Sequence, residues 1–115
     1  MPYSEALADR VRLFFKRKRI PFEEKKMMGG ICFMVNDKIC VGVDRDRLLA
    51  RVGELNYESS LRKKGVKKMD ITGRPLRGFV LVGKDSIDTE EGLDYWVNLC
   101  LEFNPQAKAA KSRHK

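Results

Sequence analysis

Histidine is almost missing from this sequence, because its single copy is His114, next to the last residue. Imidazole is the usual base of catalytic triads and the commonest metal ligand in proteins, so neither kind of site has a histidine in the expected fold. Cysteine is scarce as well: Cys32, Cys40 and Cys100 cannot all pair with one another, and none belongs to a C-x-x-C motif of a metal site. We therefore expect reduced, partly buried thiols, no metal and no cofactor.

Long apolar runs are absent too. Near the N-terminus, Glu5 and Asp9 stand where a signal peptide would have its apolar segment, and no stretch is long enough to cross a bilayer. These absences predict a cytoplasmic protein without a membrane contact. The 115 residues, 43% of them hydrophobic, predict one domain that buries about two-thirds of the surface that its unfolded chain exposes.

Acidic residues are few in two basic stretches of the chain, whose formal net charge is +8. Residues 10–19 hold six bases and no acid, and residues 62–77 hold seven bases and the single acid Asp70. By contrast, residues 85–102 hold six acids and no base. Clustered positive charge attracts phosphate backbones whatever their base sequence, so nonspecific nucleic-acid binding is one predicted function.

Three helices are predicted from apolar residues at helical spacing. The first begins after Ser4, a good N-cap, and the second covers residues 56–64, with Gly65 placed to end it in a left-handed conformation. The third begins at Asp88 or Thr89 and has the clearest apolar stripe. That stripe consists of Leu93, Trp96, Val97, Cys100 and Leu101.

Five strands are predicted from short apolar segments bounded by turn residues. They cover residues 22–28, 31–35, 39–43, 48–52 and 79–82. The first four have short connections and must form an antiparallel meander, to which the last adds one late strand. The predicted fold class is therefore α+β, with a largely antiparallel five-stranded sheet packed with three helices. We expect one domain over residues 1–104 and a disordered basic tail over residues 105–115.

The predicted hairpin at the turn Asn36-Asp37 is apolar on both faces. With a two-residue turn, Val35 faces Lys38 and Phe33 faces Cys40. One face then carries Ile31, Phe33, Val35 and Cys40, and the other carries Cys32, Met34, Ile39, Val41 and Val43. Such a sheet needs helices on both faces or a second chain, so we expect a protein partner or self-association, for example as a homodimer.

Several motifs in one order resemble the TfoX/Sxy N-terminal domain family. They are EKKMMGGICFMVN at residues 24–36, RVG at 51–53, Tyr57, Met69-Asp70, and GRPLRGFV at residues 73–80. The likeness runs from about Tyr3 to Phe103 and implies a small α+β domain with an antiparallel sheet. The family's namesake is a bacterial regulator of natural competence that acts with the cyclic-AMP receptor protein at certain promoters. It carries a second, C-terminal domain, whereas this chain resembles the stand-alone members.

The loop TGRPLRG at residues 72–78 has two interpretations. Gly73 and Gly78 permit unusual backbone angles, and Arg74 and Arg77 would present a fork of donors to a phosphate. The loop is not a G-x-x-x-x-G-K-[ST] motif, and no helix is predicted after it, which favours a turn that leads into the next strand. Similarly, Gly29 and Gly30 indicate a β-bulge or a close approach of a ligand or backbone. The candidate anion or nucleic-acid contacts are Lys25, Lys26, Arg62, Lys63, Lys64, Lys67, Lys68, Arg74 and Arg77.

Enzyme activity is not expected. The acids of residues 85–94 surround a helix start, where the helix dipole stabilises carboxylates without any catalytic role. The predicted function is a small non-enzymatic interaction domain that is an accessory to transcription regulation, with nonspecific nucleic-acid binding through the basic patches as the alternative.

Overall fold

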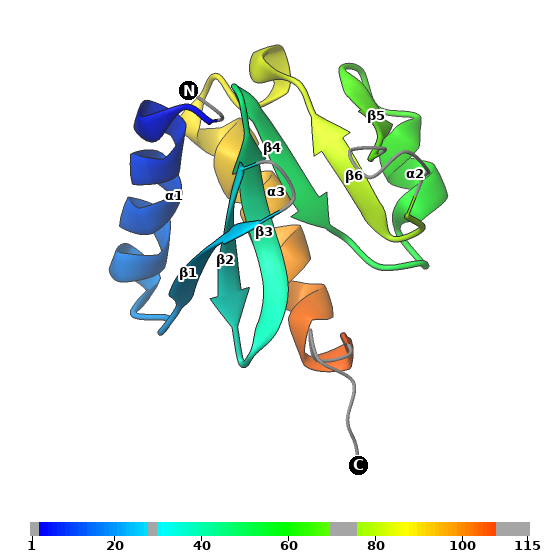
Figure 1. Cartoon of the computed structure of the whole chain (residues 1–115). Coiled ribbons are helices and arrows are strands. Elements are labelled where there is room, and N and C mark those ends of the chain that lie inside the picture. The colour runs from blue at the N-terminus through cyan, green and yellow to red at the C-terminus, as the bar shows by residue number, and fades with distance from the viewer. Residues whose placement is uncertain (1–2, 28–29, 70–75, 108–115) are drawn as a thin grey trace.

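A computed structural model describes residues 3–27, 30–69 and 76–107. Within these ranges, three α-helices pack with one antiparallel sheet of six strands in the order β1-β2-β3-β4-β6-β5 (Figure 1). The strands are β1 (Glu23–Met27), β2 (Gly30–Val35), β3 (Lys38–Asp44), β4 (Arg47–Arg51), β5 (Val66–Lys68) and β6 (Phe79–Val82). The helices are α1 (Glu5–Lys18), α2 (Tyr57–Leu61) and α3 (Glu90–Phe103), with 3-10 turns η1 (Lys84–Ser86) and η2 (Asn104–Gln106). The α+β class is confirmed, but the sheet has six strands instead of five.

The ends of the two long helices follow the capping signals of the sequence. Ser4 accepts a hydrogen bond from the backbone N–H of Leu7 at 3.1 Å, and Thr89 accepts one from Gly92 at 3.0 Å. Arg19 closes α1 with a left-handed φ of 58°. None of the helices within the described ranges is long and apolar enough to cross a membrane.

Strand β5 was not predicted, because only one of its three residues is apolar. The short helix α2 ends at Leu61, and the following residues turn the chain onto the free edge of β6. Gly65 has the expected positive φ of 80°, but it lies in this turn instead of at the helix end. Its carbonyl accepts a hydrogen bond from Gly83 at 2.8 Å, which aligns Val66 with Val82. On its other edge β6 pairs with β4, although residues 52–78 separate these two strands in the chain.

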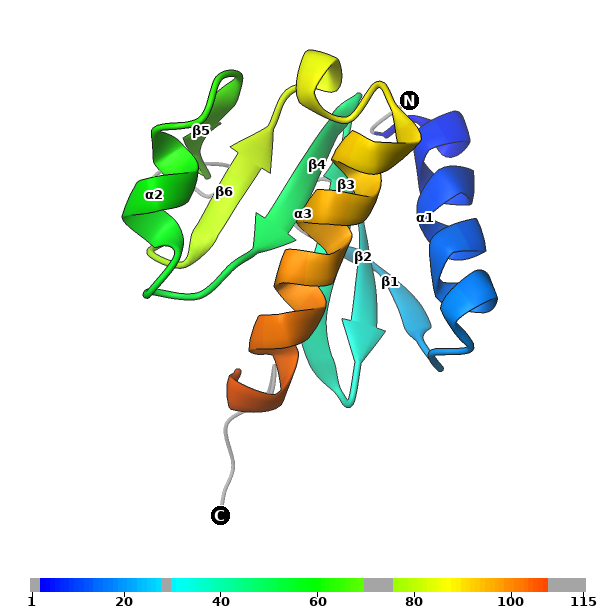
Figure 2. The ribbon, with the colours of Figure 1, turned by 180° about the vertical axis from the view of Figure 1, so that it is seen from behind.

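Helices α1 and α3 cover one face of the sheet, as Figure 2 shows from behind. Their apolar stripes join alternate strand residues in the main core, where Phe14, Phe15 and Phe33 are fully buried. Stacking of Phe22 on Phe15, with ring centroids 5.1 Å apart, carries this core to the start of β1.

The hairpin between β2 and β3 contains a bulge that the sequence did not reveal. Asn36 and Asp37 form the predicted two-residue turn, with φ of 55° and 64°, and Val35 pairs with Lys38. The register then shifts, because Met34 pairs with Ile39 whereas Phe33 pairs with Val41. The predicted pairing of Phe33 with Cys40 was wrong. The extra residue in β3 turns Val41 and Val43 toward the helices, so both belong to the main core.

The second face of the sheet carries a smaller apolar cluster that the chain itself buries. Its buried members are Cys32, Met34, Ile39, Leu49, Met69 and Leu81. Met69 is fully buried, and its carbonyl accepts a hydrogen bond from the N–H of Leu76, which packs on the same cluster. The expectation that only helices or a second chain would cover this face was therefore wrong, because residues that flank the 70–75 segment pack on it.

The end of α3 is attached to the tip of the hairpin through a buried asparagine. The side-chain N–H of Asn104, which is 3% exposed, donates to the carbonyl of Val35 at 3.1 Å, and its oxygen accepts from Asn36 at 3.1 Å. Lys38 donates to the backbone carbonyl of Asn104 at 3.1 Å. These contacts order η2 and bury Ala107, so residues 105–107 belong to the fold and not to a disordered tail. Residues 108–115 of the predicted tail lie outside the described ranges.

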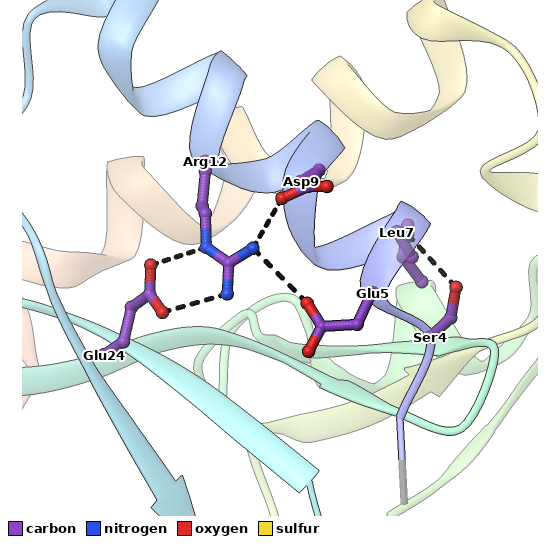
Figure 3. A network of polar contacts seen from close by, with 6 residues as sticks. All are labelled: Ser4, Glu5, Leu7, Asp9, Arg12 and Glu24. Carbon is purple, nitrogen blue, oxygen red and sulfur yellow. Dashed lines mark hydrogen bonds and ion pairs between the residues drawn. The ribbon is translucent and has the colours of Figure 1, made fainter. Parts of the chain in front are cut away.

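Helix α1 is joined to the edge strand β1 by the guanidinium of Arg12 (Figure 3). Two of its nitrogens bond the carboxylate of Glu24 at 2.6 and 3.0 Å, and a third contacts Asp9 at 2.6 Å and Glu5 at 3.6 Å. The bond to Glu24 is the main cause that raises the pKa of Arg12 above its usual value. This network places β1 beside the helix layer.

Candidate functional site

The predicted basic contacts do not form one surface, because the sheet separates them. Lys25 and Lys26 lie exposed on β1, at one edge, whereas Lys67 and Lys68 lie exposed on β5, at the opposite edge (Figure 1). Five of the predicted cations do lie together between the end of α2 and the end of β5. We call this group the basic edge: Arg62, Lys63, Lys64, Lys67 and Lys68. Gly29, Gly73 and Arg74 lie outside the described residues.

The charges of the basic edge are not neutralised by carboxylates of the described ranges. All five side chains are exposed, and the ion pairs found among described residues involve other cations. Among the described residues, Lys63 alone of this group lies over an aromatic ring, with its ammonium 5.1 Å from the ring centre of Tyr95 on α3. The basic edge is therefore an exposed concentration of positive charge.

Arg77 is exposed but has partners within the molecule. Its guanidinium lies 3.5 Å from a carboxylate oxygen of Glu54 and 3.7 Å from one of Glu58, and 4.9 Å from the ring centre of Tyr57. The neighbouring Gly78 has a positive φ of 91°, and its carbonyl accepts hydrogen bonds from two residues that follow β4. At residues 76–78 the structure favours a turn that leads into β6 over a phosphate loop.

The cations of α1 are also partly neutralised within the molecule. Arg17 lies 3.6 Å from a carboxylate oxygen of Asp94, and Arg10 donates to the carbonyl of Thr89 at 3.2 Å. The basic first helix therefore lies beside the acidic start of α3. Charge of the two signs is less separated in space than along the chain.

Gly30 is required by a close backbone approach and not by a bulge. The pairing of β1 with β2 is regular over its whole length, with Met27 opposite Gly30. A Cβ on Gly30 would lie only 2.0 Å from the carbonyl oxygen of Val43. The bulge interpretation was wrong at this residue, and its alternative, the close approach of a backbone, is correct.

The structure adds a cation that sequence reasoning missed. Arg47, the first residue of β4, forms an ion pair with Asp44 across the turn between β3 and β4. Together with Lys67 and Lys68 it lines a cavity of about 610 Å³. The repeated pattern Asp44-Arg45-Asp46-Arg47 is the signal that would have found it, because a two-residue turn brings its first and last residues together.

The three thiols are buried and unsuited to nucleophilic chemistry. Burial raises the pKa of Cys32 to about 11 and that of Cys40 to about 12, and it raises the pKa of Cys100 well above its usual value. All three are therefore protonated at neutral pH. In the part of the chain that the structure describes, no three His, Cys, Asp or Glu side chains are grouped as a metal site would require.

A second cavity, of about 310 Å³, lies beside the C-terminal end of α3. Val52, Leu55 and Phe103 form its apolar part, and Glu54 and Glu102 are its acids. Leu55 is 92% exposed, far more than any other large apolar side chain of the described residues. No signal in the sequence singled out this residue.

Comparison with known proteins identifies the family. The model of the TfoX N-terminal domain matches residues 16–104, which is well over half of the chain. No curated protein and no solved structure matches the chain. The matched region begins within α1 and includes all six strands, α2 and α3. The chain therefore belongs to the TfoX N-terminal domain family.

Proposed function

We propose that this chain is a small non-enzymatic interaction domain that acts as an accessory to transcription regulation by binding a protein partner. Membership of the TfoX N-terminal domain family supports the regulatory role. The observation that carries the binding role is the exposed Leu55 beside the cavity at the end of α3. Exposed apolar side chains that adjoin an apolar cavity are typical of docking sites for proteins.

The position of Leu55 follows from the packing of the chain before it. Gly53 has a φ of 86°, and a Cβ on it would lie 2.4 Å from the ring of Phe103. The chain therefore crosses directly over that ring, and it places Leu55 beside the cavity instead of in the core. The side chain forms an apolar contact that is available to a partner.

The charges around this cavity indicate the chemistry of the partner. Glu54 and Glu102 line it, and Glu58 lies near Glu54 because both contact Arg77. We expect a segment with an apolar side chain that fills the cavity and with lysine or arginine beside it. A second copy of this chain is the other occupant to be tested. The second face of the sheet does not need a second copy, because the chain itself buries that face.

The buried thiols support a non-enzymatic role. Burial keeps Cys32, Cys40 and Cys100 protonated, so none of them is a ready nucleophile at neutral pH. The acids at the start of α3 have a structural role there, because Glu90 and Glu91 occupy the first turn of the helix and Asp94 pairs with Arg17.

The test compares Leu55→Ser with Leu13→Ser in pull-downs from the native host. Leu13 lies on α1 and is 53% exposed, the next most exposed large apolar side chain of the described residues after Leu55, so L13S makes the same chemical change at another place. A partner that the wild-type chain and L13S retain but L55S loses would support the proposal. Equal retention by both variants would refute it. Light scattering of the same three proteins tests self-association, because a dimer formed through this cavity would dissociate only in L55S.

The basic edge supports a second candidate, nonspecific nucleic-acid binding. Five exposed cations without carboxylate partners in the described ranges would release counterions from five phosphates, which gives a slope of log K against log salt of roughly −4.5 on duplex DNA. Replacing Arg62, Lys63 and Lys64 by Gln should reduce this slope by roughly 3 units, whereas Lys25→Gln/Lys26→Gln on the other edge should leave it unchanged. Loss of all binding on removal of residues 108–115 would show that the tail, and not the basic edge, makes the contact.

A further inference from the structure

The cavity at Arg47 combines positive charge with an apolar lining. Arg47, Lys67 and Lys68 contribute three cations, and Leu61, Val66 and Leu81 contribute three aliphatic side chains. Its volume of about 610 Å³ is within the range of pockets that hold small molecules. It lies where α2, β4, β5 and β6 meet, close to the basic edge.

The register of the sheet explains why Arg47 and Lys67 converge, whereas Lys68, which pairs with Val80, lies on the other face. Leu81 pairs with Leu49 on one side and with Lys67 on the other, so the three residues share one face. Arg47 precedes Leu49 by two residues and therefore lies on the same face as Lys67. Continued by one residue, the register of β4 and β6 sets Arg47 opposite Gly83, which has no side chain to fill the space beside the guanidinium.

The guanidinium of Arg47 retains an unused donor. Asp44, only 7% exposed, binds one of its terminal nitrogens and fixes its position. The Nε atom is buried and has no hydrogen-bond acceptor within the part of the chain that the structure describes. Buried polar atoms without a partner are rare in proteins, and a ligand oxygen is one of the groups that satisfies them. A held guanidinium with a free N–H is suited to bind an oxyanion.

We propose that this cavity binds a phosphate monoester, with the phosphate on Arg47 and Lys67, which share one face of the sheet, and the apolar part of the ligand beside Leu81. Lys68 also lines the cavity and adds to its positive charge. A phosphate monoester carries between one and two negative charges near pH 7, which matches a cavity lined by three cations, of which Arg47 also pairs with Asp44. The phosphate belongs either to a free nucleotide or to the terminus of a nucleic-acid strand. The inference rests partly on the nucleic-acid candidate, because Lys67 and Lys68 belong to the basic edge. Arg47 does not belong to the basic edge and is used by this inference alone.

The test is an NMR titration of the 15N-labelled full chain with adenosine 5′-monophosphate, adenosine, inorganic phosphate and a 5′-phosphorylated oligonucleotide of twelve thymidines. Saturable shifts at residues 47, 66–68 and 81–83 with the monophosphate, and none with adenosine, are expected. The double variant Lys67→Gln/Lys68→Gln should weaken this binding roughly tenfold or more, because it replaces two charged lysines of the cavity by neutral side chains. Arg47→Gln should weaken the binding by a similar factor. If R47Q does not fold, K67Q/K68Q still tests the site, because both of its lysines are exposed. Lys25→Gln/Lys26→Gln removes the same charge at the opposite edge and should change the affinity less than twofold.

The four ligands separate the outcomes. Tighter binding of the monophosphate assigns the site to free phosphate esters, and tighter binding of the oligonucleotide with the same shifts assigns it to strand ends; both support the site. Equal weakening in K25Q/K26Q, or equal binding of adenosine, would overturn it. If oligonucleotide binding depends on Arg62, Lys63 and Lys64 but not on Arg47, the inference fails while the nucleic-acid candidate stands.

Discussion

Asn104 gives the sharpest test of how the end of α3 is held. Replacing it by alanine removes the hydrogen bond to the Val35 carbonyl and the one from Asn36, both 3.1 Å long. Each such bond contributes about 1 kcal/mol net, so we expect Asn104→Ala to lower the free energy of unfolding by about 2 kcal/mol. The Val35 carbonyl is not left without a partner, because a two-residue turn also gives it the amide of Lys38.

Urea unfolding followed by the fluorescence of the buried Trp96 measures this change. In a thermal scan, about 2 kcal/mol corresponds to a decrease in Tm of about 8 °C for a domain of this size. The control is Asn36→Gly, which removes only the exposed partner and tolerates the φ of 55°; it should cost about 0.5 kcal/mol, because water replaces that bond. A loss below about 0.5 kcal/mol for N104A, or equal losses for both variants, would refute the reasoning.

Three further predictions concern packing, the thiols and the ion pairs. Gly30→Ala should lower the free energy of unfolding by about 1–3 kcal/mol, because the new Cβ would lie 2.0 Å from a carbonyl oxygen of β3; an unchanged urea midpoint would contradict this close approach. Since burial raises the pKa of the thiols, the folded state keeps protons that the unfolded state loses, so stability should fall by roughly 1 kcal/mol per thiol between pH 9 and pH 10. Urea unfolding of Cys32→Ala should show a smaller decrease than the wild type, and an equal decrease would mean that other groups cause it. Arg12→Gln should cost about 1 kcal/mol because it breaks a bidentate contact, whereas Arg77→Gln, at a 56% exposed side chain, should cost almost nothing; equal urea midpoints would argue against the network in Figure 3.

The parts of the fold that could be predicted are those that depend on neighbouring residues. Ser4 and Thr89 cap helices through groups three residues away, and Asn36-Asp37 forms a turn because both residues tolerate a positive φ. Strand β5 was missed because its pairing with β6, and not its own apolar content, makes it a strand. The bulge at Cys40 was missed for a similar reason, because it depends on how the whole sheet packs against the helices.

The candidate site was harder to predict because it depends on strand order. Consecutive strands usually lie side by side, yet β6 is inserted between β4 and β5. This insertion places Lys67 near Arg47, which is 20 positions earlier in the chain, and leaves Lys25 at the far edge. A list of basic residues in sequence order carries no such information. The exposure of Leu55 likewise follows from the crossing of Gly53 over Phe103.

The segment between β4 and β6 has a consequence for how this domain could diversify. Leu55, the basic edge and two of the three cations at the cavity of Arg47 all belong to this single excursion of the chain. Within the described residues, the excursion joins the sheet through the three-residue strand β5, and it contributes Val52 and Tyr57 to the main core and Met69 to the smaller cluster. New specificities can therefore arise by changing the exposed positions of one contiguous stretch of sequence, provided that Val52, Tyr57 and Met69 keep filling the hydrophobic interior.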